Sequence, residues 1–469
     1  MKLIYNVEDR MSFGKMVVFA IQQLLAIMAA TLVVPMIIGN GMKSEAALFG
    51  AGVGTLVYIA FTKKKSPVFL GSSFAFLGSM AAAFAGGVSA AVGYLGLILG
   101  AIFAGLVYVV IAFVVKAVGV DWVNKLMPPV VIGPTVAIIG LSLAGNAIGD
   151  LKSGEVFVKE VVDGVEVSTQ LASPLATILC GLVTLFVTIL CSTFGKKTLK
   201  LIPFIIGILA GYVVALVMTL IGNAADIDAL KVMSFDSLAA LFKTADGSTG
   251  VTLKTFFAVP EFTFMTALGG FDEITGAYIG TIAVAYIPVA FVVFAEHIAD
   301  HKNISSIIER DLLKEPGLSR TLLGDGVGSM AGAFFGGCPN TTYGESVGCV
   351  AITRNASIVT IITAACGAIL ISFLSPFVAF VNSIPSCVMG GVCMALYGFI
   401  AVSGLKMLQK VDLGQNKNLF TASVILIAGI GGLSVSFGKV TLTAIACALI
   451  LGIIVNVMLS KAKEEETEE

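Results

Sequence analysis

Charged side chains are scarce in this sequence of 469 residues, where Asp, Glu, Lys and Arg together make up only 12%. A soluble domain carries about a quarter of its residues as charged groups. The shortage excludes a surface that faces mainly water, and lipid is the alternative solvent. The net charge is −1 and no basic block occurs, so the composition also excludes a nucleic-acid partner.

Features of secreted proteins and of enzymes are missing as well. Residues 1–15 are polar and lack a short apolar core with a cleavage site, so they are expected to form a cytoplasmic arm. The eight cysteines lie in or beside apolar segments without a CxxC pair, which argues against disulfides. The only two histidines, His297 and His301, lack further convergent metal ligands, and no nucleophile–base constellation appears. The sequence predicts neither an enzyme nor a bound metal or cofactor.

Long apolar runs are what the sequence has instead, with 57% hydrophobic residues. A helix needs about 20 mainly apolar residues to cross roughly 30 Å of hydrocarbon. Seven spans precede the polar segment 223–277 and seven follow it. The predicted spans are 13–39, 46–62, 67–85, 90–117, 126–149, 172–195, 200–222, 278–301, 317–337, 340–353, 356–382, 384–405, 418–437 and 439–460. This pattern predicts an all-α polytopic protein in a lipid bilayer.

The distribution of Lys and Arg predicts the orientation. With the N-terminus in the cytoplasm, most of the 28 basic residues lie on the inner side, as membrane proteins prefer. Because the predicted number of spans is even, both termini are cytoplasmic, and the 223–277 segment lies outside. The acidic tail at 461–469 lies inside. The prediction is a multi-pass protein of the cell membrane.

Two of the predicted spans are interrupted by polar and helix-breaking residues. The third begins at Pro67 and carries Gly-Ser-Ser at 71–73, and the tenth has Pro-Asn-Thr-Thr at 339–342. Irregular backbone at membrane depth survives only where protein or a cavity satisfies its polar groups. Matching interruptions in two seven-span halves predict inverted repeats with a binding site between them. Each is predicted to be a short extended strand leading into a half-helix; two kinked helices are the alternative.

Several carboxyl groups fall inside predicted spans, where a charge is costly, and three of them are candidate site residues. Glu296 follows a long apolar run, Asp300 sits one turn later on the same helix face, and Glu345 lies in the interrupted tenth span. Packing hydrogen bonds between helices are the alternative for the two glutamates. Asp300 could instead be hydrated, because its span is predicted to end near residue 301. Desolvation favours a protonated carboxyl, so such groups can couple proton movement to ligand binding.

Two carboxyl groups and two half-helix N-termini suit a small, flat, neutral ligand with alternating donors and acceptors. Ionised carboxylates only accept hydrogen bonds, so they seek N–H groups, whereas exposed backbone N–H groups seek carbonyls. A pyrimidinedione offers both along its edges. Phe74 and Tyr343, which flank the two interruptions, could stack on its ring.

At these residues the sequence resembles the nucleobase–ascorbate transporter family and, within it, the bacterial uracil:proton symporters. The matching stretches are VFLGSSFAF (68–76), VVFAEH (292–297), DLLKEPGLSR (311–320), CPNTTYGESVGCVAITR (338–354) and IPSCVMGGVCMALYGFIAVSG (384–404). They are spread over most of the chain, and NTTYGE with AEH is a specific combination. The resemblance implies secondary active import of uracil by proton symport, with a homodimer as a possible assembly.

The resemblance also implies the domain organisation. The family has fourteen segments in two inverted repeats, with a core domain of segments 1–4 and 8–11 and a gate domain of segments 5–7 and 12–14. In this sequence the core domain would comprise 13–118 and 278–382, and the gate domain 126–222 and 384–461. The segment 223–277 would form an extracytoplasmic loop.

By the resemblance, Glu296 and Glu345 would bind N–H groups of the substrate. The main-chain amides of Phe74 and Gly344 would meet its carbonyls, and Glu296 with Asp300 would couple the proton. The implied substrate-binding residues are Glu296, Glu345, Ser73, Phe74, Tyr343, Gly344 and, from the gate domain, Tyr397.

Several positions depart from the family pattern. Gln22-Gln23 replace the usual Gln-His in the first span, and Ser346 replaces the usual Asn after Glu345. Asp300 stands where uracil carriers often have a second His and purine carriers often have Asp. Purine carriers typically have Gln at the position of Glu345, so this residue favours uracil over the alternative of xanthine or another purine base. An ion channel would need polar groups along a continuous pore, whereas here they gather at one depth.

Overall fold

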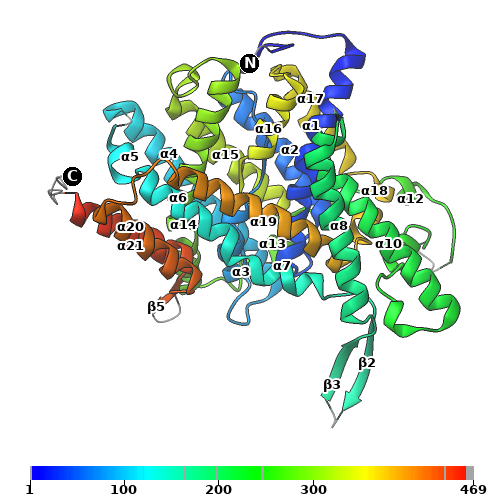
Figure 1. Cartoon of the computed structure of the whole chain (residues 1–469). Coiled ribbons are helices and arrows are strands. Elements are labelled where there is room, and N and C mark those ends of the chain that lie inside the picture. The colour runs from blue at the N-terminus through cyan, green and yellow to red at the C-terminus, as the bar shows by residue number, and fades with distance from the viewer. Residues whose placement is uncertain are drawn as a thin grey trace.

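The computed structural model describes residues 3–119, 121–162, 165–196, 198–244, 248–437 and 440–460, so the acidic tail at 461–469 lies outside the described residues. Before residue 226 it contains α1 (Phe13–Ile38), α2 (Ser44–Phe61), β1 (Leu70–Ser72), η1 (Phe74–Phe76), α3 (Leu77–Ala83), α4 (Ala90–Val118), α5 (Asp121–Leu126), α6 (Pro129–Ser142), α7 (Ala144–Leu151), β2 (Phe157–Val162), β3 (Val165–Gln170), α8 (Pro174–Phe194), α9 (Thr198–Leu201) and α10 (Pro203–Ala225). Figure 1 shows the β2–β3 hairpin projecting away from the helices.

In the described residues of the polar segment between the two halves, all the helices are short. These are η2 (Asp228–Leu230), α11 (Asp236–Ala240), α12 (Leu253–Phe256), α13 (Thr263–Ala267) and η3 (Leu268–Gly270). The second half contains α14 (Gly276–Ile308), the π-helical turn η4 (Leu313–Gly317), α15 (Leu318–Gly336), β4 (Asn340–Thr342), α16 (Gly344–Thr353), α17 (Ile358–Ile371), α18 (Ser375–Asn382), α19 (Ser386–Leu408), α20 (Asn416–Ile430), β5 (Val435–Phe437), β6 (Val440–Leu442) and α21 (Ala444–Leu459).

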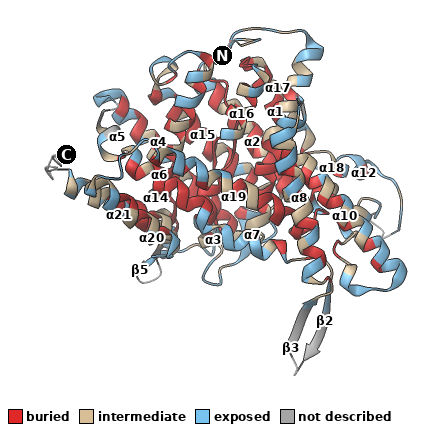
Figure 2. Cartoon of the chain, viewed as in Figure 1, coloured by how far each residue is buried: buried red, intermediate tan, exposed pale blue. Residues whose placement is uncertain are grey.

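Eight helical segments within the described ranges are long and apolar enough to cross a membrane: α1, α2, α4, α6 with α7, α8, α10, α14 and α19. Four shorter apolar helices accompany them, at Phe74–Ala83, Ile358–Ile371, Asn416–Ile430 and Ala444–Leu459. Figure 2 shows buried residues concentrated in the interior and exposed residues along α8 and α10. Several exposed residues on these two helices are large and apolar, among them Leu175, Phe186 and Val213, which suits contact with lipid. The chain is an all-α polytopic membrane protein.

Side-chain caps and prolines mark where several helices begin. The side chains of Ser89 and Thr275 each accept a hydrogen bond from a first-turn amide, at the starts of α4 and α14. Pro174 and Pro203 open α8 and α10, where the absent N–H is harmless because first-turn amides have no partner within a helix. These signals explain why the spans predicted to begin at 90 and 278 start within two residues of the helices.

The eighth span was predicted to end at residue 301, and this prediction is wrong. Helix α14 continues to Ile308 and ends at Glu309, whose φ of 56° is left-handed. The continuation has an apolar stripe, because Ile304 and Ile308 are buried while Lys302 and Ser306 are exposed. Asp300 therefore lies two turns inside the helix rather than at its end, and it is only 7% exposed.

Three other predicted spans also differ from the structure. The span 356–382 is divided into α17 and α18, and a β-bridge between Leu374 and Phe257 holds the break extended. The spans 418–437 and 439–460 are shortened because α20 ends before Gly432, whose φ is 72°. Strands β5 and β6 then pair as a hairpin before α21 begins. An apolar run alone could not distinguish these strands from helix.

Glycine allows the helices beneath the interrupted segments to approach closely. Helix α15 packs along α2. A Cβ atom added to Gly50 of α2 would collide with the carbonyl oxygen of Gly332 on α15. Likewise, a Cβ atom added to Gly332 would overlap the side chain of Asn340 at the start of β4. Small residues at such contacts let membrane helices pack backbone to backbone.

Replacing Gly50 with valine should lower the thermal stability of the purified protein. The added side chain must separate α2 from α15, and overpacking of this kind costs about 1–3 kcal/mol. The measurement is the melting temperature in detergent. Gly280→Val in α14 is the matched control, since a Cβ there meets no atom within 4 Å. Equal melting temperatures for the two variants would contradict the close approach.

Candidate functional site

The two interrupted segments meet in the middle of the structure as a pair of short strands. Strand β1 pairs antiparallel with β4, with Gly71 opposite Thr341. Each strand leads into a helix, η1 and α3 after β1 and α16 after β4. The first-turn N–H groups of a helix have no partner within it and carry the positive end of its dipole. The two helix starts therefore bring hydrogen-bond donors to the ends of the strand pair.

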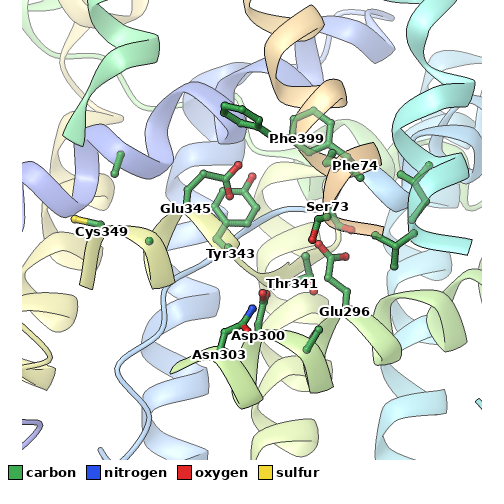
Figure 3. Close-up of a pocket in the computed structure, with 18 of the residues that line it drawn as sticks. Ser73, Phe74, Glu296, Asp300, Asn303, Thr341, Tyr343, Glu345, Cys349 and Phe399 are labelled. Atoms are coloured by element: carbon green, nitrogen blue, oxygen red, sulfur yellow. The ribbon is translucent and has the colours of Figure 1, made fainter. Parts of the chain in front are cut away.

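A cavity of about 380 Å³ lies beside the paired strands (Figure 3). Among the residues that line it from the two interrupted segments and from α14 are Ser73, Phe74, Glu296, Asp300, Thr341, Tyr343, Gly344 and Glu345. The structure therefore brings together six of the seven substrate-site residues that the sequence proposed, and also Asp300. Tyr397 is the exception, because it does not line the cavity. Its ring packs edge-on against Phe74 at 5.9 Å between centroids.

The three carboxyl groups differ in their access to this cavity. The side chains of Glu296 and Glu345 are partly exposed to it. Figure 3 shows the two glutamates apart from one another, with Tyr343 next to Glu345. Asp300 is buried, and its Oδ2 atom accepts a hydrogen bond of 2.9 Å from the hydroxyl of Thr342. The two glutamates can thus meet a ligand, whereas Asp300 is tied to strand β4.

Tyr343 forms a fixed wall of the cavity. Its hydroxyl donates a hydrogen bond of 2.7 Å to the carbonyl oxygen of Ser72. Its ring lies so close to Gly71 that any Cβ at that position would overlap it. Thr31 of α1 contacts the same hydroxyl at 3.5 Å. The ring can therefore present a constant surface to a ligand.

Ser346 connects three elements around the strand pair. Its hydroxyl oxygen accepts a hydrogen bond of 3.0 Å from the amide of Phe69, just before β1. The side-chain amide of Gln23 in α1 donates to the same oxygen at 2.5 Å. In the sequence, Gln22 and Gln23 stood out only as a departure from the family pattern. The structure shows that Gln23 bonds across helices to the residue that follows Glu345.

The two histidines face away from the cavity, into the packing between α14, α15 and α2. Nδ1 of His297 lies 2.6 Å from Oδ2 of Asp325 in α15. Nε2 of His301 lies 2.7 Å from the hydroxyl of Tyr58 in α2. Both histidines are completely buried, and their rings stack at 4.0 Å. These contacts fix the rotation of α14 so that Glu296 and Asp300 point into the cavity.

The model of the permease family matches residues 14–439. The chain belongs to this permease family.

Relatives with curated names cover nearly the whole chain of this permease. It is 38% identical to the uracil permease of Bacillus caldolyticus, over 98% of this chain and 95% of the relative. It is 37% identical to the uracil permease of Bacillus subtilis (96% and 94%) and 33% identical to that of Escherichia coli K12 (96% and 92%). Membership of this family identifies the chain as a permease rather than an enzyme.

Solved structures share the fold of this permease at low sequence identity. The transmembrane domain of the cyanobacterial bicarbonate transporter BicA superposes with a TM-score of 0.60 at 13% identity, covering 97% of this chain and all of that domain. The murine anion transporter Slc26a9, in its inward-facing state, gives 0.61 at 9% identity, covering 97% and 69%. These likenesses show the fold alone.

Sequence analysis missed several residues that line the cavity of the permease. Thr341 is one, and its buried hydroxyl oxygen, like that of Ser73, has no hydrogen-bond partner among the described residues. Others come from distant helices, namely Phe204 at the start of α10 and Phe399 of α19. Phe399 lies two residues after Tyr397, and no pattern in the sequence favoured one over the other. Only the packing of α19 shows which side chain reaches the cavity.

Replacing Ser346 with alanine should expose the backbone that precedes β1 to solvent exchange. The amide of Phe69 would lose its acceptor, so hydrogen–deuterium exchange of peptides that contain Phe69 should become faster. The measurement is exchange followed by mass spectrometry. Ser329→Ala is the matched control, because the Ser329 hydroxyl accepts from the amide of Asn340 on the other strand. An identical exchange rate at Phe69 in wild type and Ser346→Ala would contradict the prediction.

Proposed function

We propose that this permease imports uracil across the cell membrane by symport with protons. The observation that carries the proposal is the pair Glu296 and Glu345, two acceptor groups that face one cavity beside two helix starts. The relatives of 33–38% identity that are named uracil permeases support the same substrate. A neutral ring with N–H and carbonyl groups on its edges matches this set of acceptors and donors.

The proposed binding mode follows from the arrangement around the cavity. Glu296 and Glu345 accept hydrogen bonds from the two ring N–H groups. The amides of Phe74 and Gly344, at the starts of η1 and α16, donate to the ring carbonyls. The hydroxyl of Ser73, which has no hydrogen-bond partner in the described part of the chain, can add a further hydrogen bond. The ring stacks against the fixed side chain of Tyr343.

Phe74 covers the ring from the other direction in this binding mode. Tyr397 takes a supporting role, because it packs behind Phe74 instead of lining the cavity. Movement of α19 would therefore shift Phe74, which is one way for the gate domain to sense whether the site is occupied.

The proposed domain organisation has fourteen segments in two inverted repeats. The core domain comprises 13–118 and 278–382, and the gate domain comprises 126–222 and 384–461, whose last residue lies outside the described range. The antiparallel pairing of β1 with β4 supports this organisation, since each strand lies in the third segment of its half. Both termini are proposed to lie in the cytoplasm, and 223–277 outside.

A purine base such as xanthine is the competing substrate. Asp300 favours it by resemblance, whereas Glu345 favours uracil. In the structure Asp300 is bonded to Thr342 and buried, so it is less available to a substrate than Glu345. Competition of radiolabelled uracil uptake by a panel of nucleobases tests the choice. Half-inhibition by xanthine at a much lower concentration than by unlabelled uracil would overturn the proposal.

Replacing Glu345 with glutamine should raise the dissociation constant for uracil by roughly ten- to a hundredfold. Glutamine keeps only one acceptor oxygen and that oxygen is uncharged, so the ring N–H loses its charge-assisted hydrogen bond at a cost of about 1–3 kcal/mol. Calorimetry on the purified variant measures the affinity. Glu309→Gln is the matched control, because Glu309 is exposed at the end of α14. Unchanged affinity in Glu345→Gln would refute this role of the side chain.

Replacing Asp300 with asparagine should separate binding from proton coupling. Asparagine retains an acceptor for the Thr342 hydroxyl but cannot titrate. The variant should bind uracil and exchange it, yet fail to accumulate it in proteoliposomes when the outside is acidic. A protonophore should abolish accumulation by the wild type.

The control for this experiment is Asp311→Asn, since Asp311 follows α14 on the surface. Full gradient-driven accumulation by Asp300→Asn would leave Glu296 as the proton carrier. Wild-type accumulation that follows a sodium gradient and ignores the pH gradient would overturn proton symport.

A further inference from the structure

A second cavity, of about 330 Å³, lies where the segment 223–277 crosses the ends of α2, α17 and α18. Its polar lining includes Glu45 in the first turn of α2, Ser375 at the start of α18, and Lys254 of α12. Val259 and Val378 provide apolar walls. None of these residues belongs to the cavity beside the paired strands, and the proposed orientation places this second cavity on the outer side of the membrane.

Two buried polar atoms in this cavity have no partner among the described residues. They are Oε2 of Glu45 and the hydroxyl oxygen of Ser375. The two residues are 8% and 7% exposed. Buried polar atoms are almost always hydrogen-bonded, so each exception calls for a ligand or a water. Here Glu45 and Ser375 line the same cavity, so a single bound molecule could form hydrogen bonds with both side chains.

The charges around the cavity restrict the chemistry of that occupant. Glu45 contributes a carboxyl group and Lys254 an exposed ammonium group at the rim. The neighbouring charges Lys43 and Glu261 form an ion pair of 3.1 Å and cancel one another. A metal cation would meet the repulsion of Lys254, and an anion that of Glu45. A neutral ligand is repelled by neither charge. Its N–H group can donate to Glu45, and its carbonyl group can accept from Ser375 and Lys254.

We propose that this cavity is an outer docking subsite for a neutral imide or amide heterocycle, the chemical class of the transported base. A ring N–H donates to Glu45, and a ring carbonyl accepts from the hydroxyl of Ser375 and from Lys254. The apolar walls of Val259 and Val378 cover the ring faces. The ligand class rests on the proposed function, whereas the cavity and its unpaired atoms do not.

Protection of an introduced cysteine tests the subsite. Val378→Cys is made with Cys366→Ser, because Cys366 is the exposed native thiol. Right-side-out vesicles are treated with a membrane-impermeant maleimide, with and without uracil. Uracil should slow labelling of Val378→Cys. The protection should persist when Glu345→Gln is added, because that substitution acts on the other cavity.

Variants of the subsite should remove this protection. Adding Glu45→Gln should raise the uracil concentration for half-protection by roughly tenfold, as expected when a buried carboxylate acceptor is replaced by an uncharged amide. Ser375→Ala should raise it by a smaller factor. Asp272→Asn is the matched control in the same 223–277 segment, because Asp272 is exposed and does not line this cavity, and it should leave protection unchanged. If Glu45→Gln does not reach the membrane, the effect of Ser375→Ala on protection tests the subsite by itself.

The outcomes separate this inference from the proposed function. The outer docking subsite is overturned if uracil does not protect Val378→Cys. It is also overturned if Glu345→Gln abolishes the protection while Glu45→Gln preserves it. Uracil uptake can still proceed in that case. If protection depends on Glu45 but the protein transports no uracil in proteoliposomes, the subsite is supported and the proposed transport is overturned.

Discussion

The structure depends on satisfying the backbone of two strands at the depth of the membrane, where water cannot serve as a partner. Beyond the pairing of β1 with β4, side chains supply the missing bonds. Thr55 of α2 accepts from the amide of Leu70 at 2.9 Å and contacts its carbonyl oxygen at 3.2 Å. The side chain of Asn340 reaches the carbonyl oxygen of Gly50 at 3.2 Å. The interruptions depend on α2, which lies close enough to provide these groups.

This requirement also determines the chemistry of the cavity. Most donors and acceptors of the strands are used within the protein, so a ligand meets mainly the helix starts and the glutamates beyond them. Glu296 and Glu345 are open to the cavity, whereas Asp300 is held by Thr342. The acidic groups are thereby divided into two that can contact a substrate and one that is anchored to the strand pair. A protonation change at Asp300 would act on β4, and through it on the start of α16.

Much of this arrangement could be predicted because lipid limits the options. A carboxyl group at 296 or 345 within an apolar run, and Pro or Gly at 71 and 339, have few explanations in a membrane protein other than a site. The partners of Ser346 and of His297 could not be predicted, because they lie on helices distant in sequence. Nor could the choice of Phe399 over Tyr397, which depends on the rotation of α19. The hairpin at β5–β6 was missed because apolar composition is the same in strand and helix.

The buried histidines show how such rotations are fixed. A helix in lipid gains little from turning one apolar face inward, since hydrocarbon solvates every apolar face equally well. Polar contacts must therefore define the orientation. In α14 the contact of His297 with Asp325 and that of His301 with Tyr58 lie on one face. Glu296 and Asp300 are consequently directed to the adjoining face, toward the cavity. The polar residues outside the site thus determine which residues form it.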